Sequence, residues 1–385
     1  MIDKILIPLN LSAFFTAAAA SYLLVFLCIK LSFRYNCLDH PVGRKTHARP
    51  MPYLGGVAVF TAFWGITFAG IGACHFFPVF MNRVEPSHWF VSGVLYLTPK
   101  IFGIFLGSVV ILLLGLFDDK YRWPPLTKLF GQMLAAWILM SMGLNIDLAF
   151  KFGLFGHLIT FVWILLIINA FNFIDSLDGH MLGVALISSV MFIWITQIIG
   201  QAMVGLFHFV FAGAVLGLLI HNFKPAKIYA GDNGSLFIGY MMAAFTLLGT
   251  YRSHSGTYIT SFIPILIFGV PIYDTLSVIV VRLARGIPPW TGDRNHFAHR
   301  LVKIGMGDRV AVIFSYFITF TVGTVAVLAT QVELFGAVLI AIIFLSIIAT
   351  IAFLEFYTAR RIRIAEEAVL KHTKPRLADT DTHGA

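Results

Sequence analysis

The sequence predicts an all-α, polytopic integral membrane protein with about eleven transmembrane helices. Of its 385 residues, 59% are hydrophobic and only 12% are charged, whereas a soluble domain carries about 25% charged residues. The apolar residues also gather in stretches close to the length of about 20 residues that a helix needs to cross a bilayer. Together these two observations exclude a soluble globular protein and favour one bundle of helices in lipid.

Eleven apolar stretches are the expected spans. The first follows a single lysine, Lys4, and is longer than a signal-peptide core of about 7–15 residues, so we expect an uncleaved helix. Residues 1–357 are the expected membrane domain, and residues 358–385 are the expected polar C-terminal tail. The expected spans are residues 11–33, 54–74, 101–117, 127–143, 157–171, 182–200, 204–221, 235–250, 258–281, 310–330 and 334–357.

Lysine and arginine predict how the bundle is oriented, because cytoplasmic loops carry more of these residues. Eleven spans place the two termini on opposite sides of the membrane. One side would carry only five of the 27 basic residues, and the remaining 22 would lie on the other, cytoplasmic side. The excess explains the net charge of +9. No basic face stands apart from the membrane, so nucleic-acid binding is not expected. The five are Lys4, Arg83, Lys100, Lys151 and Arg252.

The carboxylates of this cytoplasmic side gather where the expected spans end. Asp118 and Asp119 follow the third span, Asp175 and Asp178 the fifth, and Asp232 the seventh. An aspartate inside the bilayer costs on the order of 3 kcal/mol even on the gentler insertion scale. A divalent cation would compensate for several such charges, and carboxylate oxygens suit Mg²⁺, which usually also binds substrate phosphates. The pattern therefore predicts a metal site and a substrate that carries phosphate.

Each acidic motif also has a simpler explanation. The pair Asp118 and Asp119 could be a solvated pair beside the membrane, and Asp178 or Asp232 could cap the helix that follows it. Taken together, these explanations do not account for two facts: the acidic residues at these span ends are almost all aspartates, and they all lie on the expected cytoplasmic side. We therefore favour the metal site. Gly231 and Gly234 would let the backbone approach its ligand closely.

A basic loop after the ninth span carries the remaining candidate residues. His296 and His299 lie three residues apart, beside Arg294 and Arg300. Histidine exchanges protons near neutral pH, and arginine binds phosphate through paired hydrogen bonds. Solvated histidines are the simpler alternative. Asp274, inside the ninth span, could pair with an arginine or shape the site.

Five ordered motifs resemble the polyprenyl-phosphate N-acetylhexosamine-1-phosphate transferases, a superfamily that includes the phospho-MurNAc-pentapeptide translocase. The resemblance covers the chain from about Asp39 to Ile304. It implies that residues 1–357 form a transferase domain in the bacterial plasma membrane, with a cytoplasmic active site. The motifs are DHPVGRKTHARPMPYLGG, GLFDDKYRW, NAFNFIDSLDG, HNFKPAKIYAGDNGSLFIG and DRNHFAHRL.

The resemblance implies that a UDP-sugar donates its sugar 1-phosphate to undecaprenyl phosphate, releasing UMP. Mg²⁺ is the implied cofactor, with Mn²⁺ as the alternative, and a homodimer is left open. The implied catalytic residues are Asp118, Asp119, Asp175 and His296. The implied metal ligands are Asp232, the main one, and Asp118. The expected substrate-binding residues are Lys45, Asn172, Asp178, Asn222, Tyr229, Arg294, His299 and Arg300.

Two departures from the family pattern bear on the donor sugar. The common histidine motif has Ala298 in place of a histidine, and the translocase's run of three histidines is absent. The missing run argues against the MurNAc-pentapeptide donor. UDP-GlcNAc is the donor that the resemblance implies, and another UDP-amino sugar or the MurNAc-pentapeptide donor is the alternative.

Two other classes of function fit the sequence less well. An ion-coupled transporter would carry acids in the middle of its spans and often shows inverted repeats. Here most acids lie at the ends of the expected spans, and the sequence shows no clear internal repeat. A non-catalytic membrane scaffold would not need the aspartate cluster.

Overall fold

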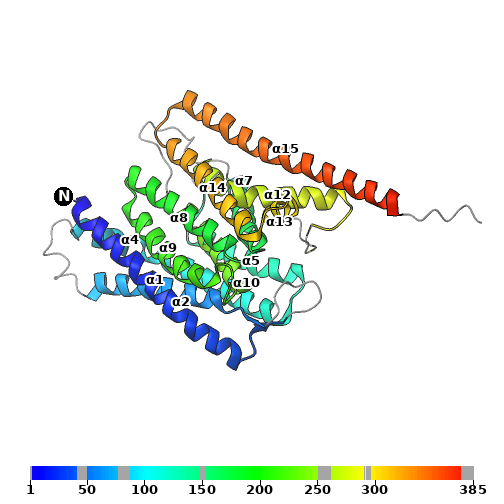
Figure 1. Cartoon of the computed structure of the whole chain (residues 1–385). Helices are drawn as coiled ribbons and strands as arrows, with labels where there is room; N and C mark the ends of the chain where they lie inside the picture. The colour runs from blue at the N-terminus through cyan, green and yellow to red at the C-terminus, as the bar shows by residue number, and fades with distance from the viewer. Residues whose placement is uncertain are drawn as a thin grey trace, which may run out of the picture. The chain divides into compact units, whose positions relative to one another are not determined.

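The computed structural model describes residues 2–40, 50–76, 87–146, 153–249, 262–289, 291 and 296–373 (Figure 1). Helices dominate it, and the only strands among the described residues are β1 (Leu38–Asp39) and β2 (Met51–Pro52), which pair antiparallel. The helices are α1 (Ile2–Arg34), α2 (Gly55–Phe76), α4 (Ser87–Tyr121), α5 (Pro125–Ser141), α7 (Leu154–Ile174), α8 (His180–Ile198), α9 (Ala202–Asn222), α10 (Gly231–Leu248), α11 (Ile263–Ile267), α12 (Gly269–Ala284), α13 (Phe297–Lys303), α14 (Asp308–Leu328) and α15 (Leu334–Thr373).

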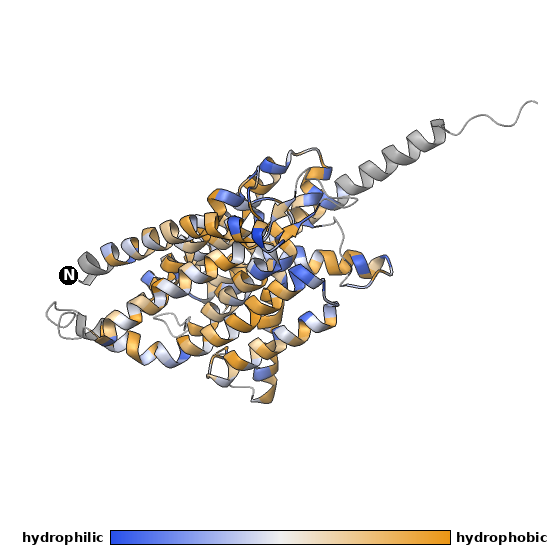
Figure 2. Cartoon of the chain, turned by 90° about the horizontal axis from the view of Figure 1, so that it is seen from below, coloured by the Kyte–Doolittle hydropathy of each residue, from blue (hydrophilic) through white to orange (hydrophobic). Residues whose placement is uncertain are grey.

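The all-helical, polytopic membrane fold expected from the sequence is confirmed. Within the described ranges, eight helices are long and apolar enough to cross a membrane, and apolar residues run along most of their lengths (Figure 2). Three of the eleven expected spans differ. The fourth is the short helix α5, the eighth begins with the polar residues of α10, and the ninth is divided between α11 and α12 at Phe268.

Helix α10 lies at the centre of the bundle, against α2, α4 and α7 (Figure 1). Every residue from Asn233 to Leu248 is buried. A helix that is hydrophobic on all sides is one that other helices surround, and after its polar first turn α10 fits this description. Because neighbouring helices hold it on several sides, the position of Asp232 in its first turn is fixed by packing.

Glycines let the neighbouring helices approach the first turn of α10 closely. A Cβ added to Gly115 of α4 would lie 2.3 Å from Cα of Asn233, and one added to Gly56 of α2 would lie 2.3 Å from Cα of Gly234. Gly231 has φ of +71°, and its space is filled by Tyr53 and Asp119. These contacts give the glycines of this turn a packing role; the close approach to a ligand expected from the sequence stays a prediction.

The β1–β2 pair also contacts the segment that leads into α10. The Tyr229 backbone N–H donates to the Pro52 carbonyl at 2.8 Å, and the Gly55 N–H donates to the Tyr229 carbonyl at 3.1 Å. The segment before α10 is thereby held between β2 and the start of α2.

The chain divides into two compact units, residues 1–337 and 338–385. Helix α15 continues without a break through the expected end of the membrane domain at residue 357. The boundary between a transferase domain and a polar tail at this residue stays a prediction.

The close approach of α4 and α10 is testable by adding one methyl group. We expect Gly115→Ala to destabilise the protein by about 1–3 kcal/mol, the usual effect of overpacking, because the backbone of Asn233 cannot yield as a side chain would. The measurement is the midpoint of thermal unfolding in detergent. Gly65→Ala on α2 is the matched control, since nothing lies within 4 Å of its added Cβ. An unchanged midpoint for Gly115→Ala would contradict this packing.

Candidate active site

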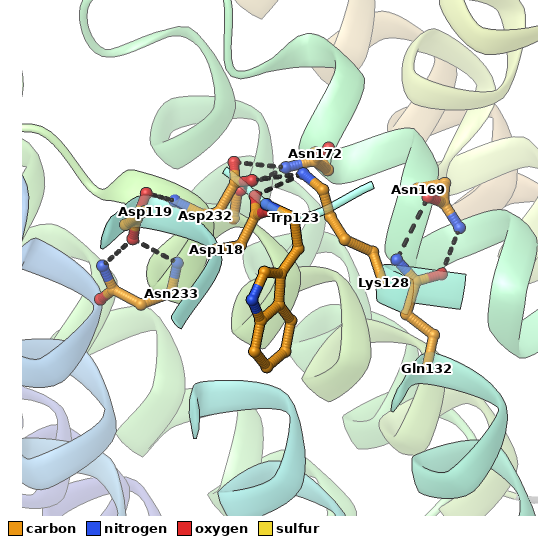
Figure 3. Close-up of polar contacts among 10 residues, drawn as sticks. Asp118, Asp119, Trp123, Lys128, Gln132, Asn169, Asn172, Asp232 and Asn233 are labelled. Atoms are coloured by element: carbon orange, nitrogen blue, oxygen red, sulfur yellow. Dashed lines mark hydrogen bonds and ion pairs between the residues drawn. The ribbon is translucent and has the colours of Figure 1, made fainter. Parts of the chain in front are cut away.

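Three helix ends bring the expected acidic residues into one region. Asp118 and Asp119 lie near the end of α4, Asp175 directly follows α7, and Asp232 lies in the first turn of α10. Because α10 packs against both α4 and α7, residues far apart in the sequence meet here, as Figure 3 shows for Asp118, Asp119 and Asp232.

Lys128 joins two of these carboxylates. Its Nζ atom lies 2.5 Å from Oδ2 of Asp118 and 2.6 Å from Oδ2 of Asp232 (Figure 3). The side chains are partly or largely withdrawn from solvent, at 23% exposure for Lys128 and 7% for Asp118. One ammonium group therefore balances carboxylates from two helices, and we call Asp118, Lys128 and Asp232 the acidic centre.

Lys128 was not among the site residues expected from the sequence, where it is one of many basic residues. The signal that could have identified it is its position: it is the second residue of the expected fourth span, ten residues after Asp118. Helix α5 starts at Pro125, and proline is favoured at the first helical position, so Lys128 lies on the first turn. One turn further, the amides of Gln132 and Asn169 bond reciprocally, at 2.7 and 3.3 Å (Figure 3), which holds α5 to α7.

Asp119 binds the first turn of α10 instead of the acidic centre. Its Oδ1 accepts from the Asp232 backbone N–H at 2.8 Å, and its Oδ2 accepts from the Asn233 backbone and side-chain N–H groups at 3.1 and 2.7 Å. The N-cap residue of α10 is Ala230, whose side chain cannot cap, and Asp119 supplies the missing acceptor from α4. The structure thus shows a positioning contact for Asp119; its expected catalytic role stays a prediction.

Asn172 links α7 to the same turn. Its Nδ2 donates to Oδ1 of Asp232 at 3.1 Å and to Oγ of Ser235 at 2.8 Å. Three helices therefore hold Asp232. Lys128 of α5 and Asn172 of α7 bind its side chain, and Asp119 of α4 accepts a hydrogen bond from its backbone N–H. The expected substrate-binding residue Asn172 lies at the centre of the site.

Asp175 and Asp178 lie in the turn between α7 and α8. Burial, followed by the charges of Asp232 and Asp178, raises the pKa of Asp175 to about 7, so this carboxyl can exchange a proton near neutral pH. Asp178 accepts a hydrogen bond at 3.2 Å from the Ala226 backbone N–H. The cap expected as the simpler explanation for Asp178 is absent, because α8 has no side-chain cap and its N-cap residue is Gly179.

Asn222 and Tyr229, the residues expected to bind the nucleotide base, flank a turn close to Asp178. The Asn222 side chain accepts from the Gly179 N–H at 2.9 Å and donates to the Ile228 carbonyl at 2.8 Å. It therefore ties together the two backbone segments that carry Asp178 and Tyr229. The pKa of Tyr229 is raised to about 12 by burial and then by the charges of Asp178 and Asp39.

The histidine motif contacts α12. His296 is 8% exposed, and its Nδ1 lies 2.9 Å from Oδ2 of Asp274. Arg300 donates to Oγ of Ser277 at 2.7 Å and lies 3.8 Å from Asp274. His299 is partly buried on the same short helix, α13. The expected residues Lys45 and Arg294 lie outside the described residues.

The donor set of the acidic centre fits a magnesium ion that also binds phosphate. The described part of the chain contains no group of three or more Asp, Glu, His or Cys residues that could hold a metal by itself. Mg²⁺ usually uses only one or two carboxylates and takes its remaining ligands from water and phosphate. Asp118 and Asp232 supply two carboxylates that already share one cation, the Lys128 ammonium.

A bundle of membrane helices whose ends bring together carboxylates, amides and a lysine defines a class of protein: a polytopic membrane enzyme that acts on phosphorylated substrates. The family model described as glycosyl transferase family 4 matches residues 101–250, which run from within α4 to the end of α10 and thus include the acidic centre.

Three relatives match most of the chain. It is 32% identical to a probable undecaprenyl-phosphate N-acetylglucosaminyl 1-phosphate transferase of Bacillus subtilis, over 84% of this chain and 86% of the relative. It is 30% identical to a decaprenyl-phosphate N-acetylglucosaminephosphotransferase of Mycolicibacterium smegmatis, over 78% and 77%. It is 24% identical to an undecaprenyl-phosphate alpha-N-acetylglucosaminyl 1-phosphate transferase of Escherichia coli K12, over 80% of each. The chain belongs to glycosyl transferase family 4, and the resemblance inferred from the five motifs is confirmed.

The role of Lys128 as the shared cation is testable without an activity assay. In the presence of EDTA, we expect Lys128→Met to destabilise the protein by about 1–3 kcal/mol, because two carboxylates lose their partner; the cost stays below that of a fully buried pair. Millimolar Mg²⁺ should raise the melting temperature of this variant more than that of the wild type. Lys120→Met, at an exposed position on α4, is the control. An equal Mg²⁺ effect on all three proteins would contradict the assignment.

Proposed function

We propose that this protein transfers N-acetylglucosamine 1-phosphate from UDP-GlcNAc to undecaprenyl phosphate, which starts the assembly of a cell-envelope polysaccharide. The main observation in support of this proposal is the acidic centre. In it Asp118 and Asp232, from separate helices, share the Lys128 ammonium group close to Asn172 and Asp175. The names of the relatives supply the donor and the acceptor. Most carboxylates of the site lie at helix ends, with Asp274 inside α12 as the exception, and this distribution favours the enzyme over a proton-coupled transporter.

The site would face the cytoplasm of a bacterium. Its helix ends lie on the side to which the sequence assigns 22 of the 27 basic residues, and the positive-inside rule makes that side cytoplasmic. UDP-sugars are soluble and reach the site from water, whereas the lipid phosphate reaches it from the inner leaflet. An active site at the membrane surface brings these two substrates together.

The donor would lie with its diphosphate at the acidic centre and its base toward Asp178. Asp118 and Asp232 would hold Mg²⁺, which neutralises charge on the phosphate oxygens. The Tyr229 ring would stack on the uracil, and Asp178 would accept a hydrogen bond from the uracil N–H. Asn222 would act by holding the two segments that present these side chains, since both ends of its amide bind backbone.

The transfer itself requires mainly positioning and charge neutralisation. An oxygen of the lipid phosphate would attack the β-phosphorus of the donor, and the bond from this phosphorus to the bridging oxygen would break, releasing UMP. The second pKa of a phosphate monoester is about 6, so the acceptor is largely ionised at neutral pH. Asp175 would take up any residual proton, and Lys128 would stabilise the growing negative charge.

A reconstituted reaction tests the proposal directly. Purified protein with UDP-GlcNAc, undecaprenyl phosphate and Mg²⁺ should release UMP, and EDTA should stop the reaction until Mg²⁺ or Mn²⁺ is restored. Asp232→Asn should lower kcat by about 100-fold or more, a typical loss for an electrostatic group of this kind. Glu333→Gln, outside the described site, is the control. Near-normal turnover by Asp232→Asn would contradict the role of the acidic centre.

The donor sugar needs its own experiment. With radiolabelled undecaprenyl phosphate, we expect turnover with UDP-GlcNAc to exceed turnover with UDP-GalNAc, UDP-QuiNAc and UDP-MurNAc-pentapeptide. The absence of a run of three histidines is the sequence feature that argues against the last donor. Faster turnover with any of the other three would move the assignment to that sugar while leaving the type of reaction intact.

A further inference from the structure

Asp274 is a carboxylate inside helix α12 with no exposed surface. An ionised carboxylate in this environment is costly unless it is paired and hydrogen-bonded. Its partners are therefore informative, and all those found among the described residues lie on α13 (Phe297–Lys303) or at its N-cap, His296.

Both oxygens of Asp274 are used. Oδ2 lies 2.9 Å from Nδ1 of His296, and Oδ1 accepts from the backbone N–H of Phe297. Arg300 lies 3.8 Å from Oδ1, and its second anchor is Ser277, one turn along α12. The carboxylate thus contacts the first turn of α13 and a ring nitrogen of its N-cap histidine.

This contact fixes which ring nitrogen of His296 carries a proton. A carboxylate accepts hydrogen bonds, so Nδ1 of His296 must donate one, and the free nitrogen is Nε2. Nε2 has no hydrogen-bond partner among the described residues. The histidine ring also packs edge-on against Phe173, with ring centroids 5.7 Å apart.

Phe173 connects this pair to the acidic centre. It directly follows Asn172, the residue that binds Asp232, and it precedes Asp175 by two positions. The guanidinium of Arg282, also on α12, lies over the same ring at 5.4 Å. The His296 ring is therefore adjacent to the segment of α7 that holds the acidic centre.

We propose that Asp274 is a positioning residue for the transfer reaction: it holds His296 with Nδ1–H toward α12, so that Nε2 is presented to the phosphate groups of the bound substrates. The inference rests on the proposed function. Nε2 of the neutral ring accepts a hydrogen bond or proton, and that of the charged ring donates one to a phosphate oxygen. Asp274 favours the same orientation in both states, because Nδ1 carries a proton in each.

A purely structural role is the competing explanation, since Asp274 also binds the backbone of α13. The two roles differ in what they predict for a double-mutant cycle. If Asp274 acts through His296, its substitution costs nothing further once His296 is absent. If it only fastens α13 to α12, the cost remains.

The experiment compares Asp274→Asn, His296→Gln and the double variant in the UMP-release assay. We expect Asp274→Asn to lower kcat by about 10–100-fold, the usual effect of losing the carboxylate partner of a functional histidine, with KM for UDP-GlcNAc unchanged. The double variant should be no slower than His296→Gln alone. Thr275→Val is the matched control: it is a buried neighbour on α12 whose hydroxyl has no hydrogen-bond partner within the described part of the chain, and we expect wild-type turnover.

Two outcomes overturn the proposal. One is a loss from Asp274→Asn that is equally large with and without His296. The other is a ¹⁵N spectrum of the histidine-labelled wild-type protein, with His296 assigned by its absence in His296→Gln, in which Nδ1 carries no proton. This second measurement does not require Asp274→Asn to fold. The ¹⁵N measurement can also be interpreted if the wild type releases no UMP from any donor. That absence of UMP release would reject the proposed function without testing the orientation of His296.

Discussion

The pairing of Asp118 and Asp232 with one cation is the constraint on which this structure depends. Two ionised carboxylates from different helices repel each other at close range, and the Lys128 ammonium between them offsets this repulsion. Three helices must therefore meet with their ends in register. The glycine contacts of α10, the capping of its first turn by Asp119 and the amide pair between α5 and α7 all serve this arrangement.

The same balance of charges accounts for the chemistry we propose. A centre in which carboxylates and an ammonium group alternate can accept both a metal ion and the negative phosphates that accompany it. A second contact, between Asp274 and His296, joins α12 to the N-cap of the short helix α13. The α7 segment that contains Asn172 and Phe173 touches both arrangements, because Asn172 binds Asp232 and Phe173 packs against His296.

For several residues of the motifs, the contacts in the structure reveal a role in packing or positioning that the sequence motifs did not indicate. Asp119 is one of two adjacent aspartates, yet only Asp118 contacts Lys128, because successive residues of a helix point in different directions. Asn222 binds backbone at both ends of its amide, so it ties together the segments that carry Asp178 and Tyr229. The glycines that begin α10 give room to the neighbouring helices α2 and α4.

The sequence by itself determined the membrane fold, the family and the helix ends at which the acidic residues gather, because hydrophobic length and motif order are local properties of the chain. Only the tertiary structure decided which of these residues touch. Lys128 looked like an ordinary basic residue beside a span. For Asp274 the sequence offered an arginine as a partner, whereas its nearer side-chain partner is His296. A pairing between residues about a hundred positions apart, such as Lys128 with Asp232, arises from helix packing, which no local pattern records.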